Sequence, residues 1–392
     1  MTLHIYDRRE RALVSAGDAM LTGLAALARP FRRRRRPPAP ARILLVRLER
    51  IGDLLMTLPA IADVRAAAPG AEIDLAVGGW NAEVARSVSG VSTVHVVDAP
   101  WLARENAGAS IGPLLRTAIG WRKRRYDLAV NFEPDIRSNA ILALSGARWT
   151  AGYRSAGGGP LLDQALDYQP GEHTVDNARR LAHAVLGGAP ATAVRMLAIP
   201  EADRREAEAL LAGGRRPFVA MHVAGGRPVK QWDPRHFTEV ARHLIESRGA
   251  TIFLTGSPDD AALISQVKTG LPAGRAVDLS GVSSLLTVAA VLECCDLMIT
   301  GDTGPMHLAA AVGTPIVAVF GPSDPRRYAP QGPRDRVIRV DLPCAPCNRI
   351  RLPPARCTGR IPDCLALVTP DRVLGAALTI LDECHQRRTA PA

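Results

Sequence analysis

The feature that most constrains the fold is a twofold alternation of short apolar runs with helical segments. The first series starts at residue 42, and the second starts near residue 217, after a polar helix expected over 201–216. Strands that alternate with helices form parallel βαβ units. The sequence therefore predicts an α/β fold with two parallel sheets in tandem. The expected strands are 42–48, 72–78, 91–98, 126–132, 217–223, 250–256, 296–300 and 315–321.

Chain length indicates the number of domains, and net charge indicates the kind of ligand. At 392 residues the chain exceeds the size at which one core usually stops growing, so we expect two domains with a cleft at the carboxyl ends of both sheets. The 49 Lys and Arg against 38 Asp and Glu give a net charge of +11, which favours a phosphate-bearing ligand, nucleic acid or an acidic membrane surface. Neither a membrane span nor a secretory leader is expected, so the chain is assigned to the cytoplasm.

The first forty residues form a basic extension. Apolar residues recur at helical spacing up to Pro30 and are followed by five consecutive arginines. Two interpretations stay open, an amphipathic helix with a polybasic run on an anionic inner leaflet, or a solvated tail. Nucleic-acid binding is disfavoured because no aromatic residues interleave the basic ones. The arginines are Arg32, Arg33, Arg34, Arg35 and Arg36.

Asp53 stands where the first strand gives way to the first helix. One interpretation makes Asp53 the N-cap of that helix, with its carboxylate accepting a bond from a free amide. In the other, a carboxylate at the carboxyl edge of the sheet accepts a proton from a substrate hydroxyl. The lone Gly52 does not make a dinucleotide fingerprint.

A glycine-containing loop, "AGGRPVKQW", follows the strand expected over 217–223. Its glycines permit close approach of the backbone to a ligand, and Arg227 and Lys230 offer cations suited to a diphosphate. The alternative is a solvated basic loop. A P-loop pattern is missing from the sequence, so ATP hydrolysis of that type is not expected.

The stretch "GDTGPMHLAAAVG" predicts a short helix after the strand expected over 296–300. Its amino end directs free amides and a positive dipole at an anion. Asp302 and Thr303 either cap this helix or bind a ligand, with the carboxylate on sugar hydroxyls and the Thr303 and Gly304 amides on phosphate. His307 is read either as a structural histidine or as a ligand contact.

Four of the seven cysteines lie within one segment, Cys344, Cys347, Cys357 and Cys364. In a cytoplasmic chain such a cluster favours zinc over disulfides. Only the first pair has zinc-ribbon spacing, so zinc binding stays open as one alternative and no metal ligand is assigned.

Three blocks together resemble glycosyltransferase family 9, the ADP-heptose:lipopolysaccharide heptosyltransferases: "ILLVRLERIGDLLMTLPAI", "KQWDPRHF" and "DLSGVSSLLTVAAVLECCDLMITGDTGPMHLAAAVGTPIVAVFGPSDP". The resemblance implies a GT-B fold with two Rossmann-like domains. It assigns 1–40 to the extension, 41–195 to an acceptor-binding domain, 196–375 to a nucleotide-sugar-binding domain, and 376–392 to a C-terminal helix and tail.

The resemblance also implies an inverting transfer without a metal or other cofactor, from an ADP-sugar to a lipid-linked or glycan acceptor. Asp53 would be the general base, and Lys230 would hold the donor phosphate. Asp302, Thr303 and Gly304 would contact the sugar and diphosphate, with His307 nearby. The "LERIGD" loop departs from the shorter polar residues often found there, which leaves the acceptor open.

Other functions remain open from sequence alone. The same fold serves transferases that use another nucleotide-sugar, and it serves nucleotide-sugar epimerases and hydrolases, which turn over their substrate without an acceptor. A binding module without catalysis is a further alternative.

Overall fold

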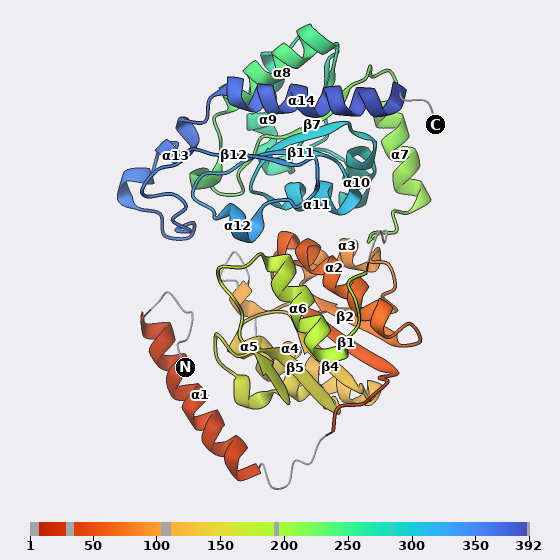
Figure 1. Ribbon diagram of the computed structural model, residues 1–392, viewed down its shortest axis with the longest axis vertical. Coiled ribbons are helices and arrows are strands. Elements are labelled where there is room, and N and C mark those ends of the chain that lie inside the picture. Colours follow the sequence, from red (N-terminus) through yellow and green to blue (C-terminus); the bar gives the residue numbers. More distant parts are fainter. Residues whose placement is uncertain (1–7, 29–34, 103–110, 192–195, 283, 390–392) are drawn as a thin grey trace. The chain divides into compact units, whose positions relative to one another are not determined.

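The computed structural model describes residues 8–28, 35–102, 111–191, 196–282 and 284–389. Figure 1 shows the elements of the chain coloured along the sequence. The chain divides into two compact units, Met1–Ala198 and Ile199–Ala392. Each unit contains one six-stranded sheet in which all neighbouring strands are parallel. The expected α/β fold with two Rossmann-like units is confirmed.

The first sheet has the order β3-β2-β1-β4-β5-β6. Its central strand β1 has four consecutive apolar residues, 43–46, and is buried except at its first residue, as expected for a strand covered on both faces. Its strands are β1 (Arg42–Arg47), β2 (Glu72–Val77), β3 (Thr93–Val96), β4 (Leu128–Asn131), β5 (Trp149–Tyr153) and β6 (Gln164–Leu166).

The helices of the first unit pack in pairs, α2 against α6 and α4 against α5. Buried side chains of α4 and α5 share a core with alternate residues of β1, including Leu44 and Val46. Because side chains alternate across a strand, the residues between them face the opposite layer. The helices are α2 (Ile51–Ala67), α3 (Ala82–Arg86), α4 (Ile111–Gly120), α5 (Ile136–Leu144) and α6 (Thr174–Leu186). Short 3₁₀ turns are η2 (Gly79–Asn81), η3 (Pro100–Leu102), η4 (Trp121–Arg124) and η5 (Gly159–Leu161).

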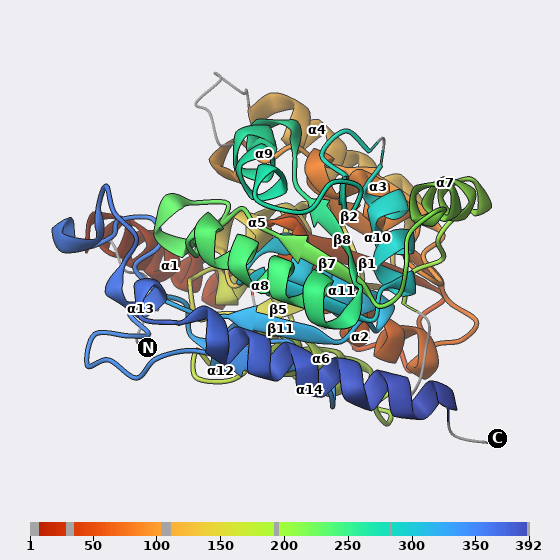
Figure 2. The ribbon, with the colours of Figure 1, turned by 90° about the horizontal axis from the view of Figure 1, so that it is seen from above.

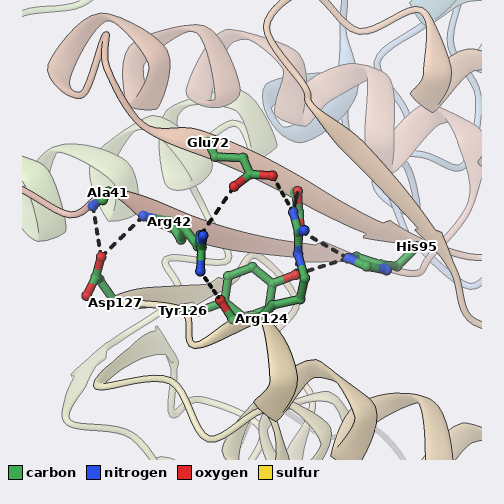
Figure 3. Close-up of polar contacts among 8 residues, drawn as sticks. Ala41, Arg42, Glu72, His95, Arg124, Tyr126 and Asp127 are labelled. Atoms are coloured by element: carbon green, nitrogen blue, oxygen red, sulfur yellow. Dashed lines mark hydrogen bonds and ion pairs between the residues drawn. The ribbon is translucent and has the colours of Figure 1, made fainter.

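A polar network joins strands at the amino end of the first sheet (Figure 3). Asp127 accepts bonds from the Ala41 and Arg42 amides at 2.9 and 3.3 Å. Arg124 binds Glu72 and also the buried carboxylate of Asp74. The Asp127 bonds hold the start of β1 next to the start of β4, and the Arg124 contacts link the segment before β4 to β2. The network lies at the end of the sheet opposite to Asp53.

The second sheet has the order β12-β11-β10-β7-β8-β9. Figure 1 shows α8 and α14 on one face of this sheet and α10 and α11 on the other, and Figure 2 shows α8 and α14 side by side. The strands are β7 (Phe218–His222), β8 (Thr251–Thr255), β9 (Ala276–Asp278), β10 (Leu297–Gly301), β11 (Ile316–Val319) and β12 (Arg336–Ile338).

The core of the second unit is built around Trp232, which is almost fully buried. Its indole Nε1 donates to the Val368 carbonyl at 2.9 Å, just before α14 begins. The helices are α7 (Glu201–Leu211), α8 (Pro234–Arg248), α9 (Ala261–Thr269), α10 (Leu285–Cys294), α11 (Gly304–Val312), α12 (Pro325–Tyr328), α13 (Asp363–Ala366) and α14 (Pro370–Thr389). Further 3₁₀ turns are η6 (Pro228–Lys230), η7 (Pro258–Asp260) and η8 (Ala355–Cys357).

The N-terminal extension contains the expected helix, α1 (Arg8–Ala28). It packs against η5, where the Gly158 amide donates to the Asp18 carboxylate at 2.7 Å. Arg32, Arg33 and Arg34 lie outside the described residues, whereas Arg35 and Arg36 are described and exposed. Among the described helices, none combines the length and the apolar character needed to cross a bilayer.

Candidate functional site

Asp53 lies in the first turn of α2, at the carboxyl edge of the first sheet. The N-cap interpretation is wrong, because α2 begins at Ile51 and its N-cap is Arg50, without a side-chain cap bond. The Asp53 amide already donates to the Arg50 carbonyl at 2.9 Å. The carboxylate, 29% exposed, is therefore left for another partner.

That partner is Arg47, the last residue of β1, whose side chain is only 4% exposed. Its Nη2 lies 3.3 Å from Oδ1 of Asp53, and its Nη1 lies 3.2 Å from Oε2 of Glu49. The same Nη1 donates to the Phe132 carbonyl at 2.6 Å, which fixes the guanidinium against β4. Arg47 thus orients the Asp53 carboxylate at the edge of the sheet.

Glu133 brings another carboxyl group to the same guanidinium. It follows β4, is almost fully buried, and accepts bonds from the Leu48 and Glu49 amides. Burial raises the pKa of Glu133, and burial together with Asp53 and Glu133 raises the pKa of Glu49 against the opposing effect of Arg47. Burial would lower the pKa of Arg47, but the carboxylates of Glu49 and Asp53 raise it above its ordinary value. The guanidinium therefore stays cationic among acidic neighbours.

Two arginine–tryptophan pairs flank this edge. Arg50 lies over the Trp80 ring at 4.9 Å and donates to the Leu102 carbonyl at 2.7 Å. Arg137 lies over the Trp101 ring at 5.1 Å. These side chains come from the segments that follow β1, β2, β3 and β4. The edge therefore combines the Asp53 carboxylate with aromatic and cationic surface.

In the second unit, Lys230 and Asp302 form a close ion pair, with Nζ 2.7 Å from Oδ2 and both side chains largely buried. Burial would raise the pKa of Asp302, but Lys230 and His307, together with a hydrogen bond from Ser323, hold it below its usual value. The carboxylate is therefore ionised, and the structure brings three of the expected site residues together.

The loop before Lys230 depends on Gly225. A Cβ at Gly225 would lie 2.6 Å from the Gln231 amide nitrogen, closer than real Cβ contacts allow. The glycine therefore lets the loop fold tightly into η6, which ends at Lys230. Arg227, the other expected cation, is exposed at the N-cap of η6.

Helix α11 begins at Gly304, with Thr303 as its N-cap residue and Gly313 ending it at a φ of 82°. Neither Asp302 nor Thr303 caps the helix with its side chain, contrary to one of the two interpretations. Asp302 is engaged with Lys230, and the Thr303 hydroxyl lies 3.1 Å from that of Thr300. The amides of the first turn are consequently not covered by either side chain, as an anion site at a helix start requires.

Two buried histidines lie at the carboxyl edge of the second sheet. His307, in α11, contributes to the ionisation of Asp302. His222 ends β7 beside Thr300 of β10, and its Nδ1 lies 3.1 Å from the Thr255 hydroxyl. Burial lowers the pKa of His222 to about 4, so it is neutral at physiological pH.

The cysteine-containing segment holds the loop around Ser323, at the carboxyl edge of the second sheet. Asn348 accepts a bond from the Asp324 amide at 2.9 Å and donates its own amide to the Pro322 carbonyl at 2.8 Å, on either side of Ser323. Burial and the nearby Cys347, Cys344 and Cys357 raise the pKa of Cys364 to about 11. In the described part of the chain, no three His, Cys, Asp or Glu side chains are arranged to hold a metal ion.

Sequence reasoning missed several of these residues. Glu133 directly follows an expected strand and could have been found, because the carboxyl ends of parallel strands share one edge. Arg47 was read as part of a buried strand, and nothing in the local pattern shows that its side chain turns toward Asp53. Ser323 and His222 reach their positions only through strand pairing.

Comparisons with known proteins agree with this architecture. The sequence model of glycosyltransferase family 9 (heptosyltransferase) matches residues 115–353. Lipopolysaccharide heptosyltransferase 2 of Escherichia coli K12 is 26% identical over 314 residues, which cover 76% of this chain and 88% of that protein.

Solved structures show the same fold. A family 9 glycosyl transferase from Veillonella parvula superposes with a TM-score of 0.76 at 23% identity, covering 88% of this chain and 98% of the other. An E. coli heptosyltransferase solved with ADP-2-deoxy-2-fluoro heptose gives a TM-score of 0.62 at 24% identity, covering 76% and 93%. Because the family match spans more than half of its length, this chain belongs to glycosyltransferase family 9 and is a glycosyltransferase.

Proposed function

We propose that this enzyme transfers a heptose from ADP-heptose to a hydroxyl of a lipopolysaccharide-core acceptor, with inversion and without a metal. The observation that carries the proposal is the pair of polar sites at the two sheet edges, the Asp53 carboxylate held by Arg47 and the Lys230–Asp302 pair beside α11. The similarity to an enzyme solved with an ADP-heptose analogue supports the donor, and the similarity to lipopolysaccharide heptosyltransferases supports the acceptor.

The reaction needs one base and one cradle for the leaving group. Asp53 accepts the proton of the acceptor hydroxyl as its oxygen attacks the anomeric carbon from the face opposite to the diphosphate. The bond between that carbon and the diphosphate oxygen breaks, and ADP leaves with the electron pair. A single displacement of this kind inverts the anomeric configuration.

The second unit supplies the cradle. Lys230 and the amides at the start of α11 stabilise the negative charge that develops on the diphosphate. Asp302 accepts hydrogen bonds from sugar hydroxyls, Thr303 and Gly304 contribute their amides, and His307 lies next to them. We accordingly assign acceptor binding to 41–195 and donor binding to 196–375, between the extension 1–40 and the tail 376–392.

We place the enzyme in the cytoplasm, on the inner face of the cytoplasmic membrane. The run Arg32–Arg36 attracts anionic lipid, since each arginine near such a surface contributes about 1 kcal/mol. The exposure of Arg35 and Arg36 supports this role.

Binding of a nucleotide panel tests the donor assignment. Calorimetry with ADP, UDP and GDP and their sugars should show selective binding of ADP and ADP-heptose. Lys230→Ala should weaken that binding about tenfold or more, because a largely buried cation is removed. Lys268→Ala, at an exposed lysine of α9, is the matched control and should leave binding unchanged.

Other outcomes distinguish the alternatives. A preference for UDP- or GDP-sugars would remove heptose from the assignment, and turnover of ADP-heptose without an acceptor would indicate an epimerase or hydrolase. Absence of any nucleotide binding by the wild type would contradict the proposed function.

A further inference from the structure

Helix α4 exposes a stripe of large apolar side chains. Ile111 is 54% exposed, Leu115 38% and Ile119 48%. These residues are spaced four apart and therefore line one side of the helix. The inward side is occupied by Leu114 and Ala118, which are buried in the core shared with β1 and α5.

The apolar arc of α4 is thus wider than its packing requires. A surface helix usually carries one apolar stripe of about 100° toward the core. Here the arc continues past the buried pair Leu114 and Ala118 to three further residues that meet solvent. Single exposed apolar residues are ordinary, but three on consecutive turns of one helix form a continuous patch.

The charge around this stripe has one sign. Residues 111–125 contain five cations and no acidic residue. Arg124 is engaged with Glu72 and Asp74 in the network of Figure 3. Exposed cations remain beside the stripe and at the end of the helix, namely Arg116, Arg122, Lys123 and Arg125. We call Ile111, Leu115, Ile119 and these four cations the α4 face.

We propose that the α4 face docks the enzyme on an anionic lipid bilayer. An apolar stripe bordered by cations without acids is complementary to the boundary between acyl chains and anionic headgroups. This membrane contact is separate from the run Arg32–Arg36, because α4 lies in the folded first unit rather than in the extension.

The location of α4 relates this membrane contact to the transfer reaction, and this step rests on the proposed function. In the sequence α4 follows η3 after residues 103–110, and the Leu102 carbonyl of η3 accepts the bond from Arg50. Arg50 is the N-cap of α2, the helix that carries Asp53 in its first turn. Since η4 leads from α4 into the start of β4, the first turn of α4 lies toward the edge that carries Asp53, and its basic end lies toward the opposite edge. Docking through α4 would therefore lay the first unit on the surface that carries a lipid-linked acceptor, with the Ile111 turn nearest to the Asp53 edge.

Vesicle sedimentation with the full chain tests the proposal. The wild type should bind vesicles of phosphatidylcholine with 30% phosphatidylglycerol, a mixture of about physiological anionic content. The double variant Leu115→Ser/Ile119→Ser should bind about tenfold more weakly, because two inserted side chains are lost. The matched control, Leu352→Ser/Leu367→Ser, removes two even more exposed apolar residues of the second unit and should bind as the wild type does.

Charge reversal provides an independent arm. Arg116→Glu/Lys123→Glu should lower binding to the mixed vesicles by at least tenfold and should reduce its dependence on salt. Charge reversal should not change binding to vesicles of phosphatidylcholine alone by a comparable factor. Thermal unfolding should give the wild-type midpoint for every variant, which shows that the changes act on the surface and not on the folding of the first unit. Calorimetry with ADP should also give wild-type affinity, because the proposed donor site lies in the second unit.

The result that would overturn the proposal is wild-type vesicle binding by both α4 variants. Replacing all five of Arg32–Arg36 by Ser should leave binding that the α4 variants reduce further, and loss of all binding on that change alone would also overturn it. So would a change in oligomeric state of Leu115→Ser/Ile119→Ser with unaltered vesicle binding, which would assign the stripe to a second copy of the chain. Failure of the wild type to bind ADP would contradict the proposed function while leaving the vesicle result interpretable.

Discussion

At the scale of single residues, the site around Asp53 depends on one buried cation, Arg47, which contacts several partners. Arg47 contacts Asp53, Glu49 and the Phe132 carbonyl. Glu133 accepts a hydrogen bond from the Leu48 amide, in the loop that directly follows Arg47. Removing one partner from a buried ionic cluster leaves the others without compensation. Arg47 is therefore a positioning residue for Asp53.

Arg47→Gln tests this role. We expect kcat/KM for transfer to fall about 100-fold and the pH above which transfer proceeds to rise, because the acidic groups lose their counter-charge. Arg47→Lys should recover part of the rate, and Arg235→Gln, at an exposed arginine of α8, should change neither quantity. An Arg47→Gln enzyme with the wild-type pH–rate profile would contradict the positioning role.

His222 gives a second prediction at this scale, on stability. Its pKa is about 4 in the folded protein and about 6.5 in the unfolded chain, so the unfolded state binds more protons between these values. Stability should therefore fall as pH decreases through this window, by about 2 kcal/mol between pH 7 and pH 5 from this residue.

Urea unfolding followed by tryptophan fluorescence measures this slope. His222→Gln should flatten it, whereas His243→Gln, at an exposed histidine of α8, should not. The prediction would be refuted by equal slopes in wild type and His222→Gln.

At the scale of elements, most inner strands and the edge strand β3 were predictable, whereas β5 and the other edge strands were not. β1, β7, β10 and β11 each contain at least three consecutive apolar residues, and the sequence places them within a residue or two of their observed bounds. β5, β6, β9 and β12 were not predicted because they are short or contain glycine and polar residues, and their pairing with neighbours defines them.

Of two helix ends, the sequence indicates one correctly and misplaces the other. Gly313, the last residue of the stretch that predicts this helix, ends α11 in the left-handed conformation that favours glycine. The start of α2 was expected at Asp53 and lies at Ile51, since the preceding turn, rather than a capping side chain, sets it. This shift of two residues is what frees the Asp53 carboxylate for Arg47.

The cysteine-containing segment offers a prediction at this scale. Asn348→Ala should lower the free energy of unfolding by about 2 kcal/mol, because the Asp324 amide loses its acceptor and alanine is strained at the φ of 55° found there. Asn348→Gly removes the acceptor without that strain and should cost about 1 kcal/mol. Equal stability of the wild type and both variants in thermal unfolding would show that the segment does not brace the Ser323 loop.

At the scale of the whole molecule, the chain separates two tasks between two units. The carboxylate that we propose as the base belongs to the first unit, and the cations and helix amides that we propose for the diphosphate belong to the second. The sequence singled out Asp53 in the first unit and Lys230 and Asp302 in the second, because charged and glycine residues stand at the strand–helix junctions there. It did not identify the partners that orient them, because strand order brings these residues together.

This separation is tested most directly by Asp53→Asn, assayed side by side for heptose transfer and for ADP binding. The account predicts that transfer falls by at least about 100-fold, as expected on loss of a general base, while ADP affinity stays that of the wild type. Asp259→Asn, at an exposed aspartate of η7, is the control for both assays and should leave both unchanged. Transfer at the wild-type rate by Asp53→Asn would contradict the assignment of Asp53 as the base.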